Sequence, residues 1–275
     1  MSKRKVNESI KEFRVKPGAK VRLKNFDPAR HWSPRHDPKL SKALADDIGR
    51  MAELEVRLYA EHRRSLLIVL QGIDASGKDG TIKHVMSGLN PQSCRVHSFK
   101  KPAGEEAEHD FLWRIHRALP GKGEIGIFNR SHYEDVLVPR VHQLVPKEVW
   151  EQRYQQINNF EQEVAETGTE ILKFFLHISK DEQRQRFQER LDDPSKHWKL
   201  SLPDFEERRL WGAYQEAFED MLSRCSTPWA PWHVVPANHK WFRNYVVAGT
   251  IVDKLEEMDP QFPPVTIDIS KIVLR

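Results

Sequence analysis

The chain has 275 residues, with 44 Lys and Arg against 40 Asp and Glu, a formal net charge of +4. This near balance does not fit a nucleic-acid coat protein, and an apolar fraction of 39% argues against wholesale disorder. The longest apolar stretches, residues 66–70 and 245–249, are too short to cross a bilayer, and two cysteines fit neither a disulfide framework nor a zinc site. We therefore expect a cytoplasmic, reduced protein that binds neither membranes nor nucleic acid.

The chain begins with a basic arm, residues 1–35, which has little periodicity and which we expect to be mobile. Residues 38–64 space their apolar side chains at three and four, as an amphipathic helix does. Five short apolar runs then alternate with helical segments: "SLLIVL", "CRVHSF", "EIGIF", "ILKFFLHI" and "WHVVPA". One helical segment covers residues 105–119, Pro146 precedes another, and Ser179 with Glu182 forms a capping box for a third.

This alternation predicts one α/β domain, residues 36–257, in which a parallel five-stranded sheet carries helices on both faces. The segment of residues 258–275 contains prolines and is expected to pack as an extended strap or to stay loose.

The first strand ends in a phosphate-binding loop. Gly72, Gly77 and Lys78 match G-x-x-x-x-G-K between an apolar run and a helical pattern, which is the context that this motif requires. Glycines let backbone N–H groups turn toward phosphate oxygens, and the helix N-terminus adds positive charge. The alternative is a glycine-rich turn with a surface lysine. The residues expected to bind phosphate here are Gly72, Ala75, Ser76, Gly77, Lys78, Asp79 and Gly80.

Two acids lie in or beside this loop, where a carboxylate would repel phosphate. Asp79 occupies the position at which a magnesium-binding Ser or Thr is expected, and Asp74 lies inside the loop. Both make sense if they bind magnesium or take a proton from an incoming phosphate. For Asp79 the alternative of capping the following helix is equally open.

Residues 123–140 hold the next concentration of polar side chains. The strand "EIGIF" delivers Asn129 to its carboxyl end, where ligands bind in open parallel sheets. Asn129 carries no charge, so Glu134 and Asp135 are the candidate metal ligands, together with Asp74. Arg130 is placed to grip a phosphate and to offset charge during transfer. The alternative is a solvated helix start, which would account for one of the two acids but not for both.

Residues 182–210 are expected to form a helical lid. Arg186 and Arg190 lie one helical turn apart, and Lys196 and Lys199 lie in the loop that follows. Such cations could bind a phosphate chain when the lid closes. The alternative is a plain helical hairpin with a solvated charged face.

Four motifs together resemble the type 2 polyphosphate kinase family: "GIDASGKDGTI", "FNRSHYEDVLV", "KFFLHISKDEQRQRFQERL" and "WHVVPANHKWFRN". The resemblance covers about residues 20–257. It implies a three-layer α/β/α P-loop kinase fold like that of thymidylate kinase, with a helical lid. It also implies a magnesium-dependent site containing Asp74, Lys78, Arg130 and the acids near Asp135. Asn129 departs from members that carry Asp in this motif, and "NRSHYEDVLV" instead resembles the class III subgroup. This resemblance implies an enzyme that accepts nucleoside mono- and diphosphates and is commonly tetrameric.

We therefore expect a reversible kinase that moves the terminal phosphoryl group of inorganic polyphosphate to AMP and ADP, with GMP and GDP as further candidates. Asp74, Lys78, Arg130 and Asp135 are the expected catalytic residues. Mg²⁺ is the expected ion, Mn²⁺ the alternative, and the assembly a homotetramer or homodimer.

Three rival functions stay open. An ATP-dependent nucleoside monophosphate kinase would share this fold. A GTPase would need an N-K-x-D motif, which the chain lacks, and a nucleic-acid binder would need a stronger basic surface.

Overall fold

The computed structural model describes residues 10–32 and 37–272, built around one parallel sheet. The strands are β1 (Ser65–Gln71), β2 (Cys94–Ser98), β3 (Ile125–Asn129), β4 (Thr169–His177) and β5 (Trp232–Pro236). Their order is β2-β3-β1-β4-β5, and each neighbouring pair is parallel. Because β1 lies between β3 and β4, its carboxyl end adjoins two other strand ends. The predicted five-stranded parallel sheet is confirmed.

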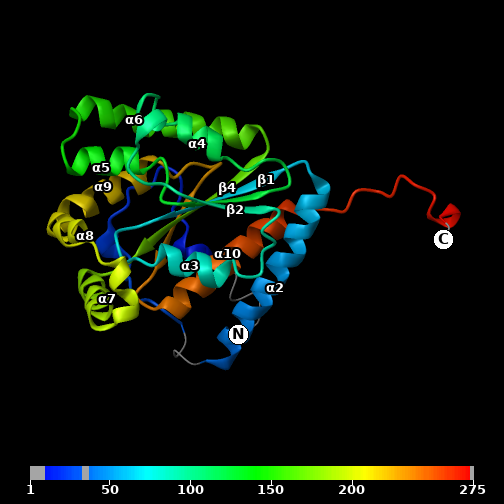
Figure 1. Ribbon diagram of the computed structural model, residues 1–275, viewed down its shortest axis with the longest axis horizontal. Coiled ribbons are helices and arrows are strands. Elements are labelled where there is room, and N and C mark those ends of the chain that lie inside the picture. Colours follow the sequence, from blue (N-terminus) through cyan, green and yellow to red (C-terminus); the bar gives the residue numbers. More distant parts are fainter. Residues whose placement is uncertain (1–9, 33–36, 273–275) are drawn as a thin grey trace.

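Helices cover both faces of the sheet and make three layers (Figure 1). On one face lie α4 (Trp113–Ala118), α5 (Glu134–Val141), α6 (Lys147–Glu166) and α9 (Trp211–Arg224). On the other lie α2 (Pro38–Glu61), α3 (Lys78–Val85) and α10 (Lys240–Met258). No helix in the described ranges is both long and apolar enough to span a bilayer.

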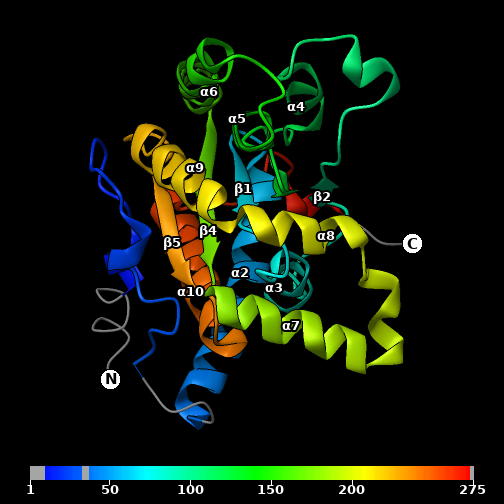
Figure 2. The same cartoon turned by 90° about the vertical axis from the view of Figure 1, so that its left-hand side faces the viewer.

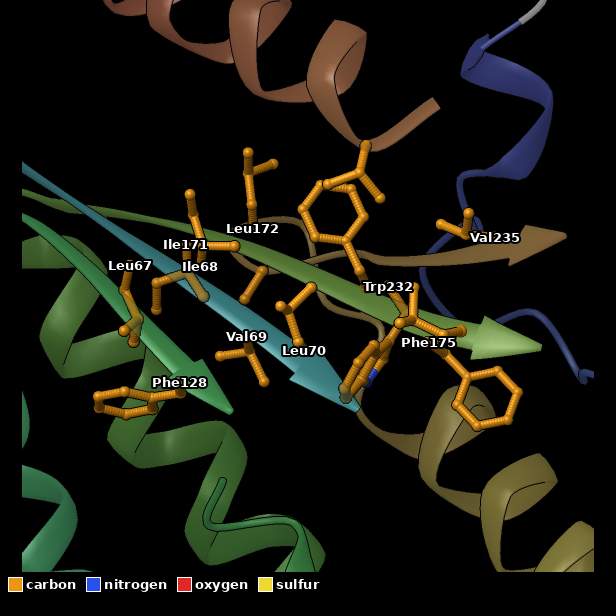
Figure 3. Packing of buried hydrophobic residues seen from close by; sticks show 14 of the residues in the cluster. Leu67, Ile68, Val69, Leu70, Phe128, Ile171, Leu172, Phe175, Trp232 and Val235 are labelled. Carbon is orange, nitrogen blue, oxygen red and sulfur yellow. The ribbon is translucent and has the colours of Figure 1, made fainter. Parts of the chain in front are cut away.

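The central strand is wholly buried because both of its faces are covered. Leu67 and Val69 lie among side chains from β3 and β4, while Phe175 and Trp232 extend the same core toward the other edge (Figure 3). Continuous apolar runs are typical of parallel strands covered on both faces. The edge strand β2 differs, since none of its residues is fully buried.

Helix ends follow local sequence signals. Asp37 caps α2 by accepting a hydrogen bond from the Lys39 amide at 2.9 Å, with Pro38 at the first helical position. Ser179 accepts the Glu182 amide at 3.1 Å and begins α7 (Lys180–Asp192), but the predicted capping box is only half formed, because the Ser179 amide donates to Asn238 Oδ1 at 3.0 Å.

The helix predicted over residues 105–119 is only partly correct. A 3₁₀ turn spans Gly104–Ala107, and α4 begins only at Trp113. Asp110 accepts the Leu112 amide at 2.9 Å, and this local bond competes with a continuous helix.

The expectation of a mobile N-terminal arm is wrong for residues 10–32, and residues 1–9 lie outside the described ranges. Phe13 and Val15 are buried, and the Val15 amide donates to the Trp232 carbonyl at 2.8 Å. The Phe13 ring packs edge-on against Phe242 with centroids 6.1 Å apart. The arm therefore covers β5 and the start of α10.

The two ends of the strands face different surroundings. α7, a 3₁₀ segment (Pro194–Lys199) and α8 (Leu202–Glu207) lie at the carboxyl edge, and α8 crosses in front of the strands (Figure 2). At the amino edge, Arg64 Nη1 donates to the Met258 carbonyl at 2.6 Å, so α10 ends beside the start of β1. Pro260 is still buried and the Gln261 amide donates to Glu61 Oε2 at 3.2 Å, but the chain beyond leads away from the body and does not form the packed strap that was one expectation (Figure 1).

Candidate active site

The loop after β1 adopts the phosphate-binding conformation. Gly72 and Gly77 have φ angles of 151° and 104°, which favour glycine, and a Cβ on Gly72 would come within 2.8 Å of the Leu176 carbonyl oxygen. Helix α3 begins directly afterwards, so its free N–H groups lie at the loop. The motif therefore forms a tight glycine turn at a helix N-terminus, which is the geometry that an anion-binding loop needs, and its binding of phosphate stays a prediction.

Lys78 lies inside this turn and is almost fully buried. Its Nζ donates to the carbonyl oxygens of Gly72 at 2.7 Å and Ile73 at 3.4 Å. Burial lowers the pKa of Lys78, and the nearby charge of Arg130 lowers it further. A phosphate at the loop would stabilise the ammonium charge, so the site favours an anionic ligand.

Asp74 and Arg130 meet across the loop. Arg130 Nη2 lies 2.8 Å from Asp74 Oδ1, in an ion pair that remains partly open to solvent. They come from the ends of β1 and β3, which are adjacent in the sheet with Leu70 opposite Asn129. Their predicted proximity is confirmed, and their roles in transfer stay predictions.

Asp79 does not cap α3. The helix has no side-chain cap bond, and Asp79 Oδ1 accepts instead from Asn129 Nδ2 at 2.7 Å. Asn129 thus orients the loop carboxylate. This hydrogen bond requires a donor at the end of β3, which an amide supplies and a carboxylate would not.

Glu134 and Asp135, the two acids proposed from the sequence as candidate metal ligands, face different directions. Glu134 Oε1 accepts from Gln71 Nε2 at 2.6 Å, at the end of β1 and in the field of Arg130. Asp135 instead lies 3.4 Å from Arg114. Consecutive residues of a helix point about 100° apart, so one turn cannot aim both at the loop. Glu134, rather than Asp135, is the acid beside the phosphate loop.

The three predicted ligands do not gather into a preformed cage. Among the described residues, no group of three or more His, Cys, Asp or Glu side chains is arranged to hold a metal ion. A metal here would take one or two carboxylates and complete its coordination with other oxygens, which is how Mg²⁺ is commonly held beside phosphates.

Asp135 lines a pocket of about 830 Å³ between the segment after β2 and helix α6. Burial raises the pKa of Asp135, and the positive charges of Arg114 and Arg153 oppose that rise. The Arg153 guanidinium lies 5.0 Å from the centre of the Phe111 ring. The sequence analysis missed Arg114, Arg153 and Phe111, because they lie outside recognised motifs and meet only in the fold.

The predicted lid cations divide into two groups. Arg186 is buried, and its guanidinium bonds Glu182 and the carbonyls of Ala75, Ser76, Ala237 and Asn238. The expectation that Arg186 binds a phosphate chain is wrong in this structure, because its donors already hold the loop backbone.

The remaining lid cations are more exposed and paired locally. Lys196 lies 2.8 Å from Asp193, and Lys199 Nζ lies 4.9 Å from the Trp198 ring centre. Arg190 lies 3.6 Å from Asp204. Their binding of phosphate stays a prediction.

A buried charged network supports the segment that carries Arg130 and Glu134. His132 and Tyr133 are buried, and both bond Glu161 Oε1, at 3.0 and 2.8 Å. Lys173 Nζ lies 2.6 Å from Glu161 Oε2 and donates to the Tyr133 hydroxyl at 2.7 Å. The pKa of Glu161 is lowered, because the Lys173 charge and the His132 bond outweigh the effect of burial. In the sequence this network is indicated only by Lys173, a lysine within the predicted apolar strand "ILKFFLHI".

Comparison with known proteins settles the family. The family model for Polyphosphate kinase 2 matches residues 35–263. The chain belongs to the polyphosphate kinase 2 family. The AMP/ADP-polyphosphate phosphotransferase of Meiothermus ruber is 50% identical, over 97% of this chain and 100% of that protein.

Further relatives agree with this assignment. The ADP-polyphosphate phosphotransferase of Rhodopseudomonas palustris is 43% identical, over 93% of each chain. The crystal structure of Polyphosphate Kinase 2 from Arthrobacter aurescens superposes with a TM-score of 0.90 and 41% identity, covering 94% of this chain and 93% of that one. The resemblance seen in the four motifs is therefore confirmed across the fold.

Proposed function

We propose that this polyphosphate kinase transfers the terminal phosphoryl group of inorganic polyphosphate to AMP and ADP, and that the reaction is reversible. The ion pair of Asp74 with Arg130, next to the buried Lys78, is the observation that supports this most directly. It brings a carboxylate and a guanidinium together within the electrostatic influence of the buried ammonium of Lys78. The names of the relatives from Meiothermus ruber and Rhodopseudomonas palustris support the same acceptors.

The proposed reaction is an in-line displacement. A terminal phosphate oxygen of the nucleotide attacks the end phosphorus of the chain, the P–O anhydride bond breaks, and the shortened polyphosphate leaves. Lys78 and the loop amides hold the phosphates at the transfer point, and Arg130 stabilises the moving charge. Asp74 orients the attacking phosphate or accepts its proton.

A divalent ion fits this side-chain set. Asp74 and Glu134 supply the one or two carboxylates that Mg²⁺ usually takes beside substrate phosphates, and Mn²⁺ accepts similar ligands. When bound, the ion would neutralise phosphate oxygens. We expect EDTA to abolish transfer and added Mg²⁺ to restore it.

The pocket beside Asp135 is the proposed seat of the acceptor nucleoside. It combines the Phe111 ring with the cations Arg114 and Arg153, and it opens at the carboxyl edge. Phe111→Ala should raise the KM for AMP several-fold, because the lost ring contact contributes about 1 kcal/mol. The KM for polyphosphate should stay unchanged. Equal changes in the KM for AMP and the KM for polyphosphate would indicate that the nucleoside binds elsewhere.

The deciding experiment supplies AMP, Mg²⁺ and polyphosphate without ATP. Nucleotide products are separated by chromatography, and guanine nucleotides are tested in parallel. ADP and ATP should form. If ADP forms only when ATP is supplied, the protein is an ATP-dependent nucleotide kinase instead. Light scattering of the same preparation tests the expected dimer or tetramer.

A further inference from the structure

Two buried arginines lie against the backbone of the phosphate loop. Arg186 comes from α7 and Arg243 from the first turns of α10, and their exposed fractions are 6% and 2%. A Cβ on Gly77 would lie 3.5 Å from Arg186 Nη1 and would overlap Arg243 Nη1. A Cβ on Gly80 would come within 3.3 Å of Arg243 Nη2. Glycine at both positions thus allows Arg243 to lie directly against the loop.

The two guanidinium groups differ in how their charge is compensated. Arg186 is paired with Glu182 at 2.7 Å and bonds four backbone carbonyls. Arg243 donates only to the side-chain oxygen of Asn244, at 3.1 and 2.8 Å, and makes no ion pair within the described ranges. Burial lowers the pKa of Arg243 to about 9, and the charge of Arg186 adds to this effect.

A buried cation without a carboxylate partner is costly, because the low-polarity interior does not replace the water it has lost. Arg186 shows that this part of the fold can pair a guanidinium with an acid. A phosphate chain in the loop would bring negative charge to the other side of residues 77–80. Attraction across this short, poorly solvated distance would offset the cost of burying Arg243.

We propose that Arg243 strengthens polyphosphate binding through the loop, as a buried positive charge that the bound phosphate chain compensates. It is a positioning residue, because the loop backbone separates it from the phosphates. This inference rests on the proposed function in one respect, namely that the loop binds a phosphate chain.

The test compares two substitutions that separate charge from hydrogen bonding. Arg243→Gln removes the charge and keeps a donor for Asn244, whereas Arg243→Lys keeps the charge and loses the planar fork. The dissociation constant for a polyphosphate of fixed length is measured by calorimetry, together with the melting temperature with and without polyphosphate. Arg224→Gln is the control, since Arg224 is partly exposed on α9 and pairs with Glu151.

Arg243→Gln should weaken polyphosphate binding by about ten-fold, a loss of about 1.4 kcal/mol, without lowering the melting temperature of the free protein. Arg243→Lys and Arg224→Gln should bind within about two-fold of the parent, a difference of about 0.4 kcal/mol. The added stability that polyphosphate confers should shrink only in the Gln variant of Arg243.

Contrary results have distinct meanings. If the parent protein does not bind polyphosphate, the proposed function fails. If the parent binds and Arg243→Gln binds equally well, or if the Gln variant unfolds while the Lys variant folds, Arg243 is purely structural. Equal weakening in the Lys and Gln variants would also overturn the role of charge.

Discussion

The phosphate loop and the lid tip both present charged side chains at the carboxyl edge of the sheet, yet they are held very differently. At the loop, Lys78 and Arg186 are buried and bonded to backbone carbonyls. At the tip, Lys196 and Lys199 are more exposed, and their side chains contact the nearby residues Asp193 and Trp198. The charged groups at the loop are therefore held in place before any phosphate binds. The cations at the tip would have to leave Asp193 and Trp198 before they could contact phosphate.

This comparison predicts that the largest effect comes from the loop. Lys78→Ala should lower kcat/KM by about two to four powers of ten, because a preorganised charge at the transfer point is lost. Steady-state kinetics with ADP and polyphosphate measures it. Lys83→Ala, on the exposed side of α3, is the matched control and should be near normal. Near-full activity of a folded Lys78→Ala protein would remove Lys78 from the mechanism.

The next largest effect is expected on stability, from the buried network of Glu161 and Lys173 that supports the segment of Arg130 and Glu134. Lys173→Met leaves the Glu161 carboxylate buried without its cation, which should cost about 3–5 kcal/mol of unfolding free energy. Urea unfolding measures this loss. Adding Glu161→Gln should recover part of it, because the unpaired charge is then gone. A single variant as stable as the parent would show that the pair does not support the segment of His132 and Tyr133.

The smallest effect is expected at the lid tip. Lys199→Ala should weaken long polyphosphate by about two- to five-fold, as for an exposed charge pair, and should affect short chains less. The measurement is KM across chains of defined length. If Lys199→Ala weakens long and short chains equally, Lys199 does not lie on the path of the phosphate chain.

The same comparison shows which features could be read from the sequence. The parallel five-stranded sheet and the meeting of Asp74 with Arg130 at its carboxyl edge follow from rules of backbone geometry: parallel strands end at one edge, and a glycine-rich loop there binds phosphate. Which of Glu134 and Asp135 faces the loop could not be predicted, because it depends on the rotation of α5 and on the position of Arg114.

Burial was the other quantity that the pattern did not reveal. Arg186 belongs to a charged run that resembles a solvated face, yet the fold turns it toward the loop carbonyls. Lys173 looks like an interruption in an apolar strand, and only the tertiary structure supplies Glu161. In both cases a long-range partner, invisible in local periodicity, decides the role of the charge.

The exit of the chain at the amino edge has a practical consequence. Since α10 ends beside Arg64 and the chain after Gln261 leads away from the body, a tether fused there would attach behind the sheet. Immobilised on a resin through this end, the enzyme would present its catalytic rim to the bulk solution. Polymeric substrates would then reach it without crossing the support.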